Sequence, residues 1–288
     1  MYHQPVLVKQ IIESLPPRTN TIIDGTFGHG WHSLAILADY PWVNIIGIDR
    51  DIAMIKKAES RMWSQKNITL WHWSYADILD LCKKNNITDV DYILLDIWVN
   101  MDHYKQPDRW FSVHEEAKLD MRFDTNQSMT ASIFINTATL DQLQQAFIQY
   151  ADFTLPKAHE LAQAIVIARK QNHIQTTTEL RTILWSCGLG KNASIVIFQA
   201  IRIVVNQELQ QLEKFLAIFD GILAIGGRCA IISYHSIEDR IVKQSFKNKV
   251  ANGSYISIHK KAIKPSWQEI KQNKASRSAV LRIIEKKQ

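Results

Sequence analysis

The chain has 288 residues, of which 46% are hydrophobic and 22% charged, and its formal net charge is +6. This length fits one large domain or a domain that carries an insertion, and the composition is that of a globular protein. No stretch reaches the roughly 18 unbroken apolar residues of a membrane span, the N-terminal MYHQPVLVKQ lacks the features of a signal peptide, and the three cysteines lack metal-site spacing, so we expect a cytoplasmic protein without a bound metal.

Apolar runs of strand length alternate with segments of helical spacing over roughly the first hundred residues. The predicted strands are TIIDGT (21–26), NIIGID (44–49), NITLWHW (67–73) and VDYILLDIW (90–98). The predicted helices between the first three strands are HSLAILADY and DIAMIKKAESRMW. Repeated strand–helix–strand units predict a parallel sheet with helices on both faces.

The alternation then stops, because residues 104–195 read mainly as helices, among them TLDQLQQAFIQYA and HELAQAIVIARK. A single further helix is predicted over about 198–219. Its apolar stripe consists of Val205, Leu209, Leu212, Leu216 and Phe219. Strands return with RCAIISY (228–234), SYISIHK and AVLRIIEK. We therefore predict an α/β domain formed by residues 1–103 and 196–288, interrupted by a helical insertion at 104–195.

The stretch DGTFGHGWHS (24–33) predicts a nucleotide-like site. Asp24 ends a strand, a glycine-rich turn follows, and Asp49 ends the next strand at a spacing that suits a ribose diol. The pattern Gly25-x-x-Gly28-x-Gly30 differs from the GxGxxG of dehydrogenases and favours a nucleoside cofactor such as S-adenosylmethionine (SAM). A glycine-turned junction without a ligand would give the same pattern, so the turn alone leaves both interpretations open.

Further stretches resemble one family in order and spacing, nearly from end to end. They are HQPVL (3–7), DGTFGHGWHS (24–33), IDRD (48–51), LLDIWVN (94–100), DRWFS (108–112), LDMRFD (119–124), FQAIRIVVNQEL (198–209), GGRCAIISYHSIEDRIVK (226–243) and NKASRSAVLR (273–282). The family is that of the bacterial small-subunit rRNA (cytosine-N4)-methyltransferases. The resemblance implies a class I SAM-dependent methyltransferase with a Rossmann-like sheet and an inserted helical domain for RNA recognition. It also implies methylation of the N4 amine of a cytosine in the decoding region of 16S rRNA, as free rRNA or within the 30S subunit.

The resemblance also implies a set of cofactor-binding positions. They are Asp24, Gly28, Gly30, Trp31, His32, Asp49, Tyr75, Asp96 and His103. In the family, the loop that corresponds to residues 30–32 holds SAM, the acid that matches Asp49 takes the ribose, and the aromatic that matches Tyr75 lies by the adenine. From the residues alone, Tyr75 could instead be a core aromatic and His32 a residue that starts a helix.

The chemistry needs hydrogen-bond acceptors for the target amine, because the lone pair of cytosine N4 is conjugated into the ring and is a poor nucleophile. Asp96 stands where many amino-methyltransferases place an acidic or amide residue after the fourth strand, but Ile-Trp-Val-Asn follows it in place of Pro-Pro-aromatic. We predict Asp96 as the orienting and proton-accepting residue, with Asn100 and His235 as weaker candidates. His235 and Glu238 could instead cap a helix, with Ser236 as its N-cap.

The positive charge is concentrated at the C-terminal end. From Arg240 onward there are 13 Lys or Arg and two acids, which gives +11, so the remainder carries −5. This distribution predicts a polyanion partner, although a solvated lysine-rich surface would look the same. LPKAHELAQAI (155–165) replaces a basic run of the family, which shifts RNA binding toward this end. The candidate RNA-contacting residues are Arg109, Arg122, Lys260, Lys261, Lys264 and Arg277.

Tryptophan replaces glycine at several motif positions. The family has glycine where this chain has Trp31, Trp98 and Trp110, and usually where it has Trp73. The chain contains 10 glycines and 9 tryptophans, whereas average usage predicts about 20 glycines. Our hypothesis is that the source organism reads UGA as glycine at these positions. The alternative is a decayed or divergent site, and UGG codons at the four positions would exclude the recoding.

Two other functions fit the same sequence. One is a catalytically inactive RNA- or ribosome-binding protein on this fold, with Trp31 and Trp98 filling the cofactor pocket. The other is a SAM methyltransferase with another substrate, because a fold does not fix a function. The sequence does not predict an oligomeric state.

Overall fold

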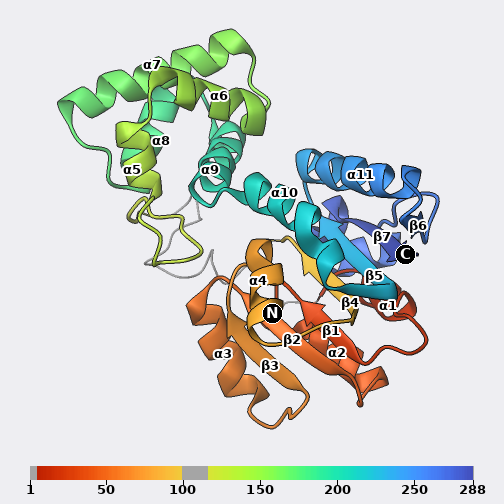
Figure 1. The fold of residues 1–288 in the computed structure, drawn as a ribbon. Helices are drawn as coiled ribbons and strands as arrows, with labels where there is room; N and C mark the ends of the chain where they lie inside the picture. Colours follow the sequence, from red (N-terminus) through yellow and green to blue (C-terminus); the bar gives the residue numbers. More distant parts are fainter. Residues whose placement is uncertain (1–4, 99–115, 288) are drawn as a thin grey trace. The chain divides into compact units, whose positions relative to one another are not determined.

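A computed structural model describes residues 5–98 and 116–287, and the chain forms two compact units (Figure 1). The first unit comprises Met1–Trp98 and Gln210–Gln288, and the second comprises Val99–Leu209. The second unit therefore ends at Leu209 and not at the predicted residue 195. The reason is that helix α9 (Lys191–Val205) buries Ile197, Phe198 and Ile201 in the core of the second unit.

The first unit is built on a seven-stranded sheet with the order β3-β2-β1-β4-β5-β7-β6. β7 runs antiparallel to both of its neighbours, β5 and β6, and the other neighbouring strands of the described sheet are parallel. This arrangement confirms the predicted Rossmann-like, class I methyltransferase sheet. The strands are β1 (Thr21–Asp24), β2 (Asn44–Asp49), β3 (Ile68–His72), β4 (Val90–Asp96), β5 (Leu223–Ser233), β6 (Tyr255–Ser257) and β7 (Val280–Lys286).

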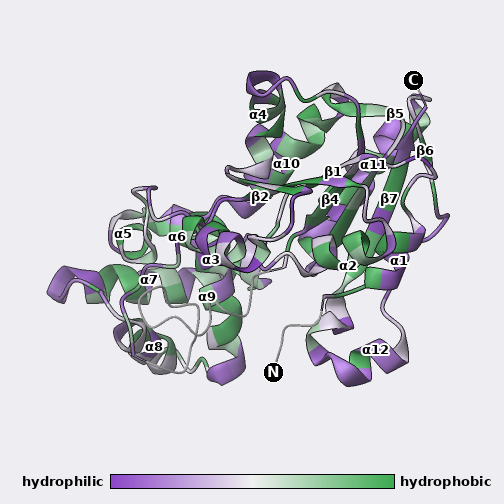
Figure 2. Cartoon of the chain, turned by 90° about the horizontal axis from the view of Figure 1, so that it is seen from below, coloured by the Kyte–Doolittle hydropathy of each residue, from purple (hydrophilic) through white to green (hydrophobic). Residues whose placement is uncertain are grey.

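Helices cover both faces of this sheet, so its central strands are buried on both sides. Ile22 packs on the face that α1 and α2 cover, whereas the next residue, Ile23, packs on the face that α4, α10 and α11 cover. Figure 2 shows β1 and β4 as hydrophobic strands. The helices and helical turns are α1 (Val8–Glu13), α2 (Trp31–Asp39), α3 (Ile52–Met62), η1 (Tyr75–Asp77), α4 (Ile78–Lys84), α10 (Glu208–Ile218), η3 (Phe219–Gly221), α11 (Ser236–Ala251), α12 (Trp267–Gln272) and η4 (Lys274–Ser278).

The second unit is helical. Its other helices are α5 (Ala131–Thr137), α6 (Leu140–Ala151), α7 (Leu155–Gln171) and α8 (Thr177–Ser186). Thr139 and Thr176 are the N-caps of α6 and α8. Each forms a capping box, Thr139 with Gln142 and Thr176 with Glu179. The helices share one apolar core, in which Leu143, Phe147, Leu161 and Leu180 have no exposed surface.

The predicted single helix over 198–219 is wrong, because α9 ends at Val205 and α10 begins at Glu208. Gln207 between them has φ = 49°. The buried Asn206 accepts a hydrogen bond from the N–H of Phe123 at 2.8 Å and donates one to the carbonyl of Met121 at 2.7 Å. The apolar stripe is therefore divided, because Val205 belongs to the core of the second unit while Leu212 and the residues after it belong to the first.

Candidate active site

Three acids end three neighbouring parallel strands: Asp24 ends β1, Asp49 ends β2 and Asp96 ends β4. β1 lies between β2 and β4 in the sheet, so the three carboxyl ends meet at one edge. Ligands of open α/β sheets bind beyond this edge. The structure thus brings together the three acids that the sequence analysis selected.

The glycine-rich turn after β1 has a backbone that other residues would strain. Gly28 and Gly30 have φ of 51° and 72°, in the left-handed region. A Cβ on Gly30 would lie 2.5 Å from the ring of Phe27. Gly30 is also the N-cap of α2, where N–H groups are left without helical partners. The turn therefore offers a close backbone approach, which fits a nucleoside cofactor.

Asp49 is tied to this turn. One carboxylate oxygen accepts a hydrogen bond from the N–H of Gly28 at 2.8 Å, and the other accepts one from the N–H of Asp51 at 2.8 Å. Burial raises the pKa of Asp49 to about 6, against the lowering effect of these two hydrogen bonds. Each carboxylate oxygen can accept a further hydrogen bond, so Asp49 fits the predicted contact with a ribose diol.

Asp24 is buried and holds the turn to α2. Its carboxylate accepts a hydrogen bond from the hydroxyl of Ser33 at 2.7 Å, and burial raises its pKa. This geometry gives Asp24 a structural role at the site, and its predicted contact with the cofactor stays a prediction.

His32 and Asp96 connect α2 to the end of β4. His32 Nδ1 lies 3.7 Å from a carboxylate oxygen of Asp96, and Nε2 lies 2.8 Å from the carbonyl oxygen of Val6. Because the carbonyl only accepts, Nε2 carries a proton. The backbone N–H of Asp96 donates to the hydroxyl of Thr26 at 2.6 Å. Asp96 is therefore held by both sides of the glycine-rich turn.

Tyr234 lies beside Asp96 and was not among the site residues predicted from the sequence. It follows β5, the strand next to β4, and is 5% exposed. Burial, followed by the charge of Asp96, raises the pKa of Tyr234 well above its usual value. Its ring packs on Trp98 with centroids 4.4 Å apart. The signal in the sequence was its place in SYHSIEDR, directly before the selected His235.

The described tryptophans at glycine positions have no left-handed backbone. Trp31, Trp73 and Trp98 are absent from the residues with positive φ, so strain from this source does not apply to them. The ring of Trp31 at the start of α2 lies under the guanidinium of Arg61, 4.8 Å from it. Trp73 donates from Nε1 to the carbonyl of Asp77 at 3.1 Å. A tryptophan at these positions can therefore affect cofactor binding only through the space that its indole occupies.

Tyr75 and His235 both have local structural contacts. Tyr75 begins η1, and its ring packs edge-on against Phe215 with centroids 5.9 Å apart. His235 is the N-cap of α11, and Glu238 accepts hydrogen bonds from the N–H groups of Tyr234 and His235 at 3.0 and 3.1 Å. The capping interpretation of His235 and Glu238 is confirmed, while Ser236 is the first helical residue and not the N-cap. Their roles toward cofactor and amine stay predictions.

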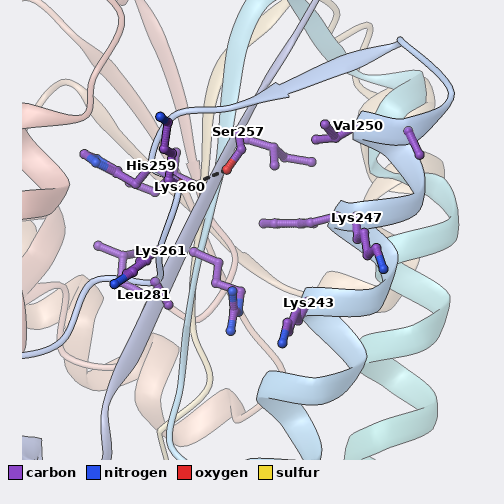
Figure 3. Close-up of a pocket in the computed structure, with 14 residues that line it drawn as sticks. Lys243, Lys247, Val250, Ser257, His259, Lys260, Lys261 and Leu281 are labelled. Carbon is purple, nitrogen blue, oxygen red and sulfur yellow. Dashed lines mark hydrogen bonds between the residues drawn. The ribbon is translucent and has the colours of Figure 1, made fainter.

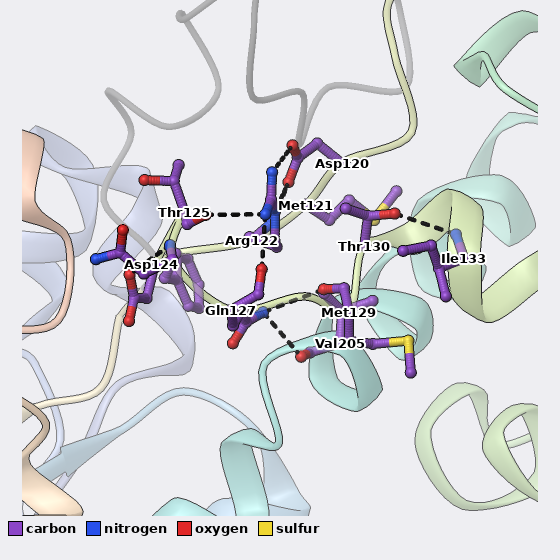
Figure 4. A network of polar contacts seen from close by, with 12 residues as sticks. Asp120, Met121, Arg122, Asp124, Thr125, Gln127, Met129, Thr130, Ile133 and Val205 are labelled. Atoms are coloured by element: carbon purple, nitrogen blue, oxygen red, sulfur yellow. Dashed lines mark hydrogen bonds and ion pairs between the residues drawn. The ribbon is translucent and has the colours of Figure 1, made fainter.

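Arg122 is enclosed by its neighbours in the second unit (Figure 4). It forms two hydrogen bonds with the carboxylate of Asp120, both at 2.7 Å, and Nη1 donates to the carbonyls of Thr125 and Gln127. The Asp120 carboxylate raises the pKa of Arg122. These contacts give Arg122 a structural role in folding the 120–127 segment, and its predicted RNA contact stays a prediction.

The other predicted RNA-binding residues divide into two groups. Lys260, Lys261, Lys264 and Arg277 are exposed side chains of the first unit. Arg109 lies outside the described residues, together with Asn100, His103 and Trp110. Within 5–98 and 116–287, no group of three or more His, Cys, Asp or Glu side chains could hold a metal ion. No helix in the same part of the chain is long and apolar enough to cross a membrane.

Comparison with known proteins identifies close relatives along the whole chain. Residues 1–287 match the MraW methylase family. A protein of Coprothermobacter proteolyticus with the name ribosomal RNA small subunit methyltransferase H is 38% identical over 290 residues, which cover 99% of this chain and 96% of the relative. Proteins with the same name from Elusimicrobium minutum and Legionella pneumophila are also 38% identical, and each alignment covers 99% of this chain and 98% of the relative.

Proposed function

Because the chain belongs to the MraW methylase family, we propose that it transfers a methyl group from SAM to the N4 amine of a cytosine in the decoding region of small-subunit rRNA. The substrate is the 16S rRNA itself or the 30S subunit, and the protein works in the cytoplasm. The relatives that carry the name ribosomal RNA small subunit methyltransferase H support this substrate class. The observation that carries the proposal is the placement of Asp24, Asp49 and Asp96 around a glycine-rich turn at one sheet edge.

The residues of the turn fit SAM as the cofactor. Gly28 and Gly30 allow the cofactor to approach the backbone closely. The carboxylate of Asp49 has two acceptor oxygens, and Asp49 follows the glycine-rich turn at the sequence spacing that suits a contact with a ribose. When bound, SAM supplies an activated methyl group on a sulfonium. The protein has to hold the amine in line with the methyl–sulfur bond and exclude other acceptors of the methyl group, such as water.

Asp96 is the residue that orients the amine in this proposal. Its carboxylate accepts a hydrogen bond from N4, which directs the lone pair and favours loss of a proton from the nitrogen. The imidazole of His32, 3.7 Å away, and the buried Tyr234 lie beside this carboxylate. Asn100 and His235 are the further candidates for this role. The target base has to leave any stack or pair to reach Asp96.

RNA binding is assigned to the basic C-terminal part of the first unit and to the helical second unit. The lysines at 260, 261 and 264 and Arg277 supply exposed positive charge for phosphates. The helical unit adds a surface outside the sheet, with Arg109 and Arg122 as its predicted contacts.

A second function is favoured by the tryptophans, namely RNA or ribosome binding without methyl transfer. Trp98 packs on Tyr234, next to the Asp96 carboxylate, where the family has glycine. A side chain of this size at 98, with another at 31, reduces the space for SAM. If UGA encodes glycine at these positions in the organism, the natural protein has the open site and the first function holds.

Calorimetry with SAM separates the two functions. It is run on the present chain and on the Trp31→Gly/Trp98→Gly variant, and a methyl-transfer assay on 30S subunits follows. Binding and transfer by the variant support the enzyme. Two folded proteins that bind RNA but no SAM support the second function. Mass mapping of rRNA from cells that lack the gene separates the proposed target from any other substrate.

A further inference from the structure

A pocket of about 370 Å³ lies between α11 and the edge of the sheet formed by β6 and β7 (Figure 3). This volume lies in the range of small-molecule sites, roughly 300–1,000 Å³. The strands β5 and β7 stand between β6 and β4, which carries Asp96. The pocket is therefore separate from the candidate active site.

The interior of the pocket is apolar, and its rim is basic. Phe246 and Val250 of α11 and Ile284 of β7 line the interior. Four lysines surround it, two on α11 and two on the segment that follows β6 (Figure 3). They are Lys243, Lys247, Lys260 and Lys261. No Asp or Glu is among the residues that line the pocket.

Neighbouring cations are paired, whereas these four lysines are not. Arg282, which also lines the pocket, forms two hydrogen bonds with Asp239 at 2.7 and 3.0 Å, and Lys249 of α11 donates to Asp220 at 2.6 Å. Within the described part of the chain, no carboxylate forms an ion pair with Lys243, Lys247, Lys260 or Lys261, and all four are exposed. Their positive charge is thus available to an anionic partner.

The combination of an apolar interior and a basic rim matches the chemistry of one nucleotide. A base has two flat faces that stack on apolar surfaces, and a charged phosphate lies on each side of the nucleotide. Proteins bind single-stranded nucleic acid with stacking surfaces beside positive charge. The imidazole of His259 lines the pocket and offers a planar surface. The hydroxyl of Ser257 donates to the carbonyl of His259 at 2.7 Å and so fixes the turn that carries this residue.

We propose that this pocket binds one unpaired nucleotide of the RNA substrate, with the base between α11 and the 257–262 segment and the flanking phosphates on the four lysines. The proposal rests on the proposed function in that the RNA is the methylation substrate. The pocket anchors the RNA at a second point, away from the cytosine that is methylated. This anchoring would be independent of SAM, because none of the pocket residues belongs to the glycine-rich turn.

The test uses fluorescence anisotropy with labelled hexaadenylate, hexauridylate and an abasic ribose-phosphate hexamer of equal charge. We expect at least about a fivefold tighter Kd for one of the hexamers with bases than for the abasic one, the ratio that corresponds to about 1 kcal/mol of stacking. Ala251→Leu, which fills part of the pocket without adding an aromatic ring or changing charge, should reduce this ratio and leave the abasic Kd unchanged. Equal affinity for all hexamers in the unmodified protein would overturn the proposal.

A double substitution that removes two positive charges, with a matched control, tests the role of the lysines at the rim. Lys247→Gln with Lys260→Gln removes two charges at the pocket, and Lys56→Gln with Lys66→Gln removes two exposed charges near β3, at the opposite edge of the sheet. The pocket pair should weaken hexamer binding more than the control pair, and equal losses would contradict a specific site. SAM binding and methyl transfer are measured in parallel in the Trp31→Gly/Trp98→Gly variant. Transfer without a base preference refutes the pocket alone, and a base preference in a folded variant that binds no SAM refutes the enzymatic function alone.

Discussion

The imidazole of His32, at the start of α2, lies 3.7 Å from the carboxylate of Asp96, at the end of β4. Since Nε2 of the same ring is held by the carbonyl of Val6 at 2.8 Å, the side that faces Asp96 is fixed in orientation. The pair joins the cofactor turn to the residue that we assign to the target amine. In the proposed function, this pair would link the binding of SAM to the orientation of the base.

Asp96→Asn should lower kcat far more than it lowers SAM affinity. The amide keeps the shape but loses the negative charge that favours proton loss from N4, and such groups contribute about 10²–10⁴-fold. The measurement is single-turnover methyl transfer to 30S subunits by the Trp31→Gly/Trp98→Gly variant with and without Asp96→Asn, with SAM affinity from calorimetry. The fold should persist, because the side chain of residue 96 is half-buried and the backbone N–H of this residue still donates its hydrogen bond to the hydroxyl of Thr26. Unchanged kcat would remove Asp96 from the chemistry.

In the Trp31→Gly/Trp98→Gly background, Asp49→Ala should weaken SAM binding by roughly 1–3 kcal/mol, as expected for loss of a charged hydrogen-bond acceptor. The protein should stay folded, because the carboxylate pairs only with the backbone of the turn and of Asp51. Asp91→Ala serves as the control, since Asp91 accepts hydrogen bonds from the N–H groups of Asn20 and Thr21 near the start of β1. An active protein with unaltered SAM affinity would exclude Asp49 from the site.

SAM affinity should fall as the pH is lowered through about 6. Burial raises the pKa of Asp49 to about 6, and the protonated carboxyl loses acceptor capacity for the ribose. The effect on folding has the opposite sign. The pKa of Asp49 in the unfolded chain is about 3.9, so this group contributes most to stability below about pH 4, and the contribution is lost as the pH rises through 6. Both profiles are measured in the Trp31→Gly/Trp98→Gly background, in which SAM should bind. Asp49→Asn should flatten both of them, and a SAM affinity that does not change between pH 5 and 8 while Asp49 is present would contradict this assignment.

RNA affinity should fall steeply with salt, since neutralised phosphates release counterions. Charge reversal of Lys260, Lys261 and Lys264 together should flatten this dependence. The plot of log Kd against log salt concentration measures it, with a 16S rRNA fragment as the probe. An unaltered slope would mean that these lysines form only a solvated surface.

The local parts of the fold could be predicted from the sequence, and the long-range contacts could not. The run NIIGID ends in an acid and forms β2 over the predicted residues 44–49, because a buried parallel strand needs only a continuous apolar run. The break between α9 and α10 depends on Asn206, whose amide pairs with Met121 and Phe123, far away in the chain. The helical periodicity of the sequence does not indicate such a distant partner.

The same limit applies to the site. The strand-end acids and the glycine turn have a local signature, whereas Tyr234 meets Asp96 only because β5 pairs with β4 in the sheet. In the same way, LDMRFD does not reveal that Asp120 and two carbonyls surround the guanidinium of Arg122, whose RNA contact stays a prediction.

The tryptophan positions give the fifth prediction. Trp31→Gly with Trp98→Gly should restore SAM binding that is weak or absent with tryptophan, since the indole of Trp98 packs on Tyr234 beside Asp96. Calorimetry of both proteins measures the difference, and Trp63→Gly is the control because Trp63 is 85% exposed and not at a motif position. If the tryptophan form binds SAM at micromolar affinity and transfers methyl groups, the recoding hypothesis loses its physical basis.

The most direct measurement is transfer of a labelled methyl group from SAM to 30S subunits, followed by nucleoside analysis of the 16S rRNA. It uses the Trp31→Gly/Trp98→Gly variant, with and without Asp96→Asn. The account predicts a single N4-methylcytosine in the decoding region, formed by the variant and lost when Asp96 is replaced. A methyl group on another base, or a folded variant that binds no SAM, would contradict it.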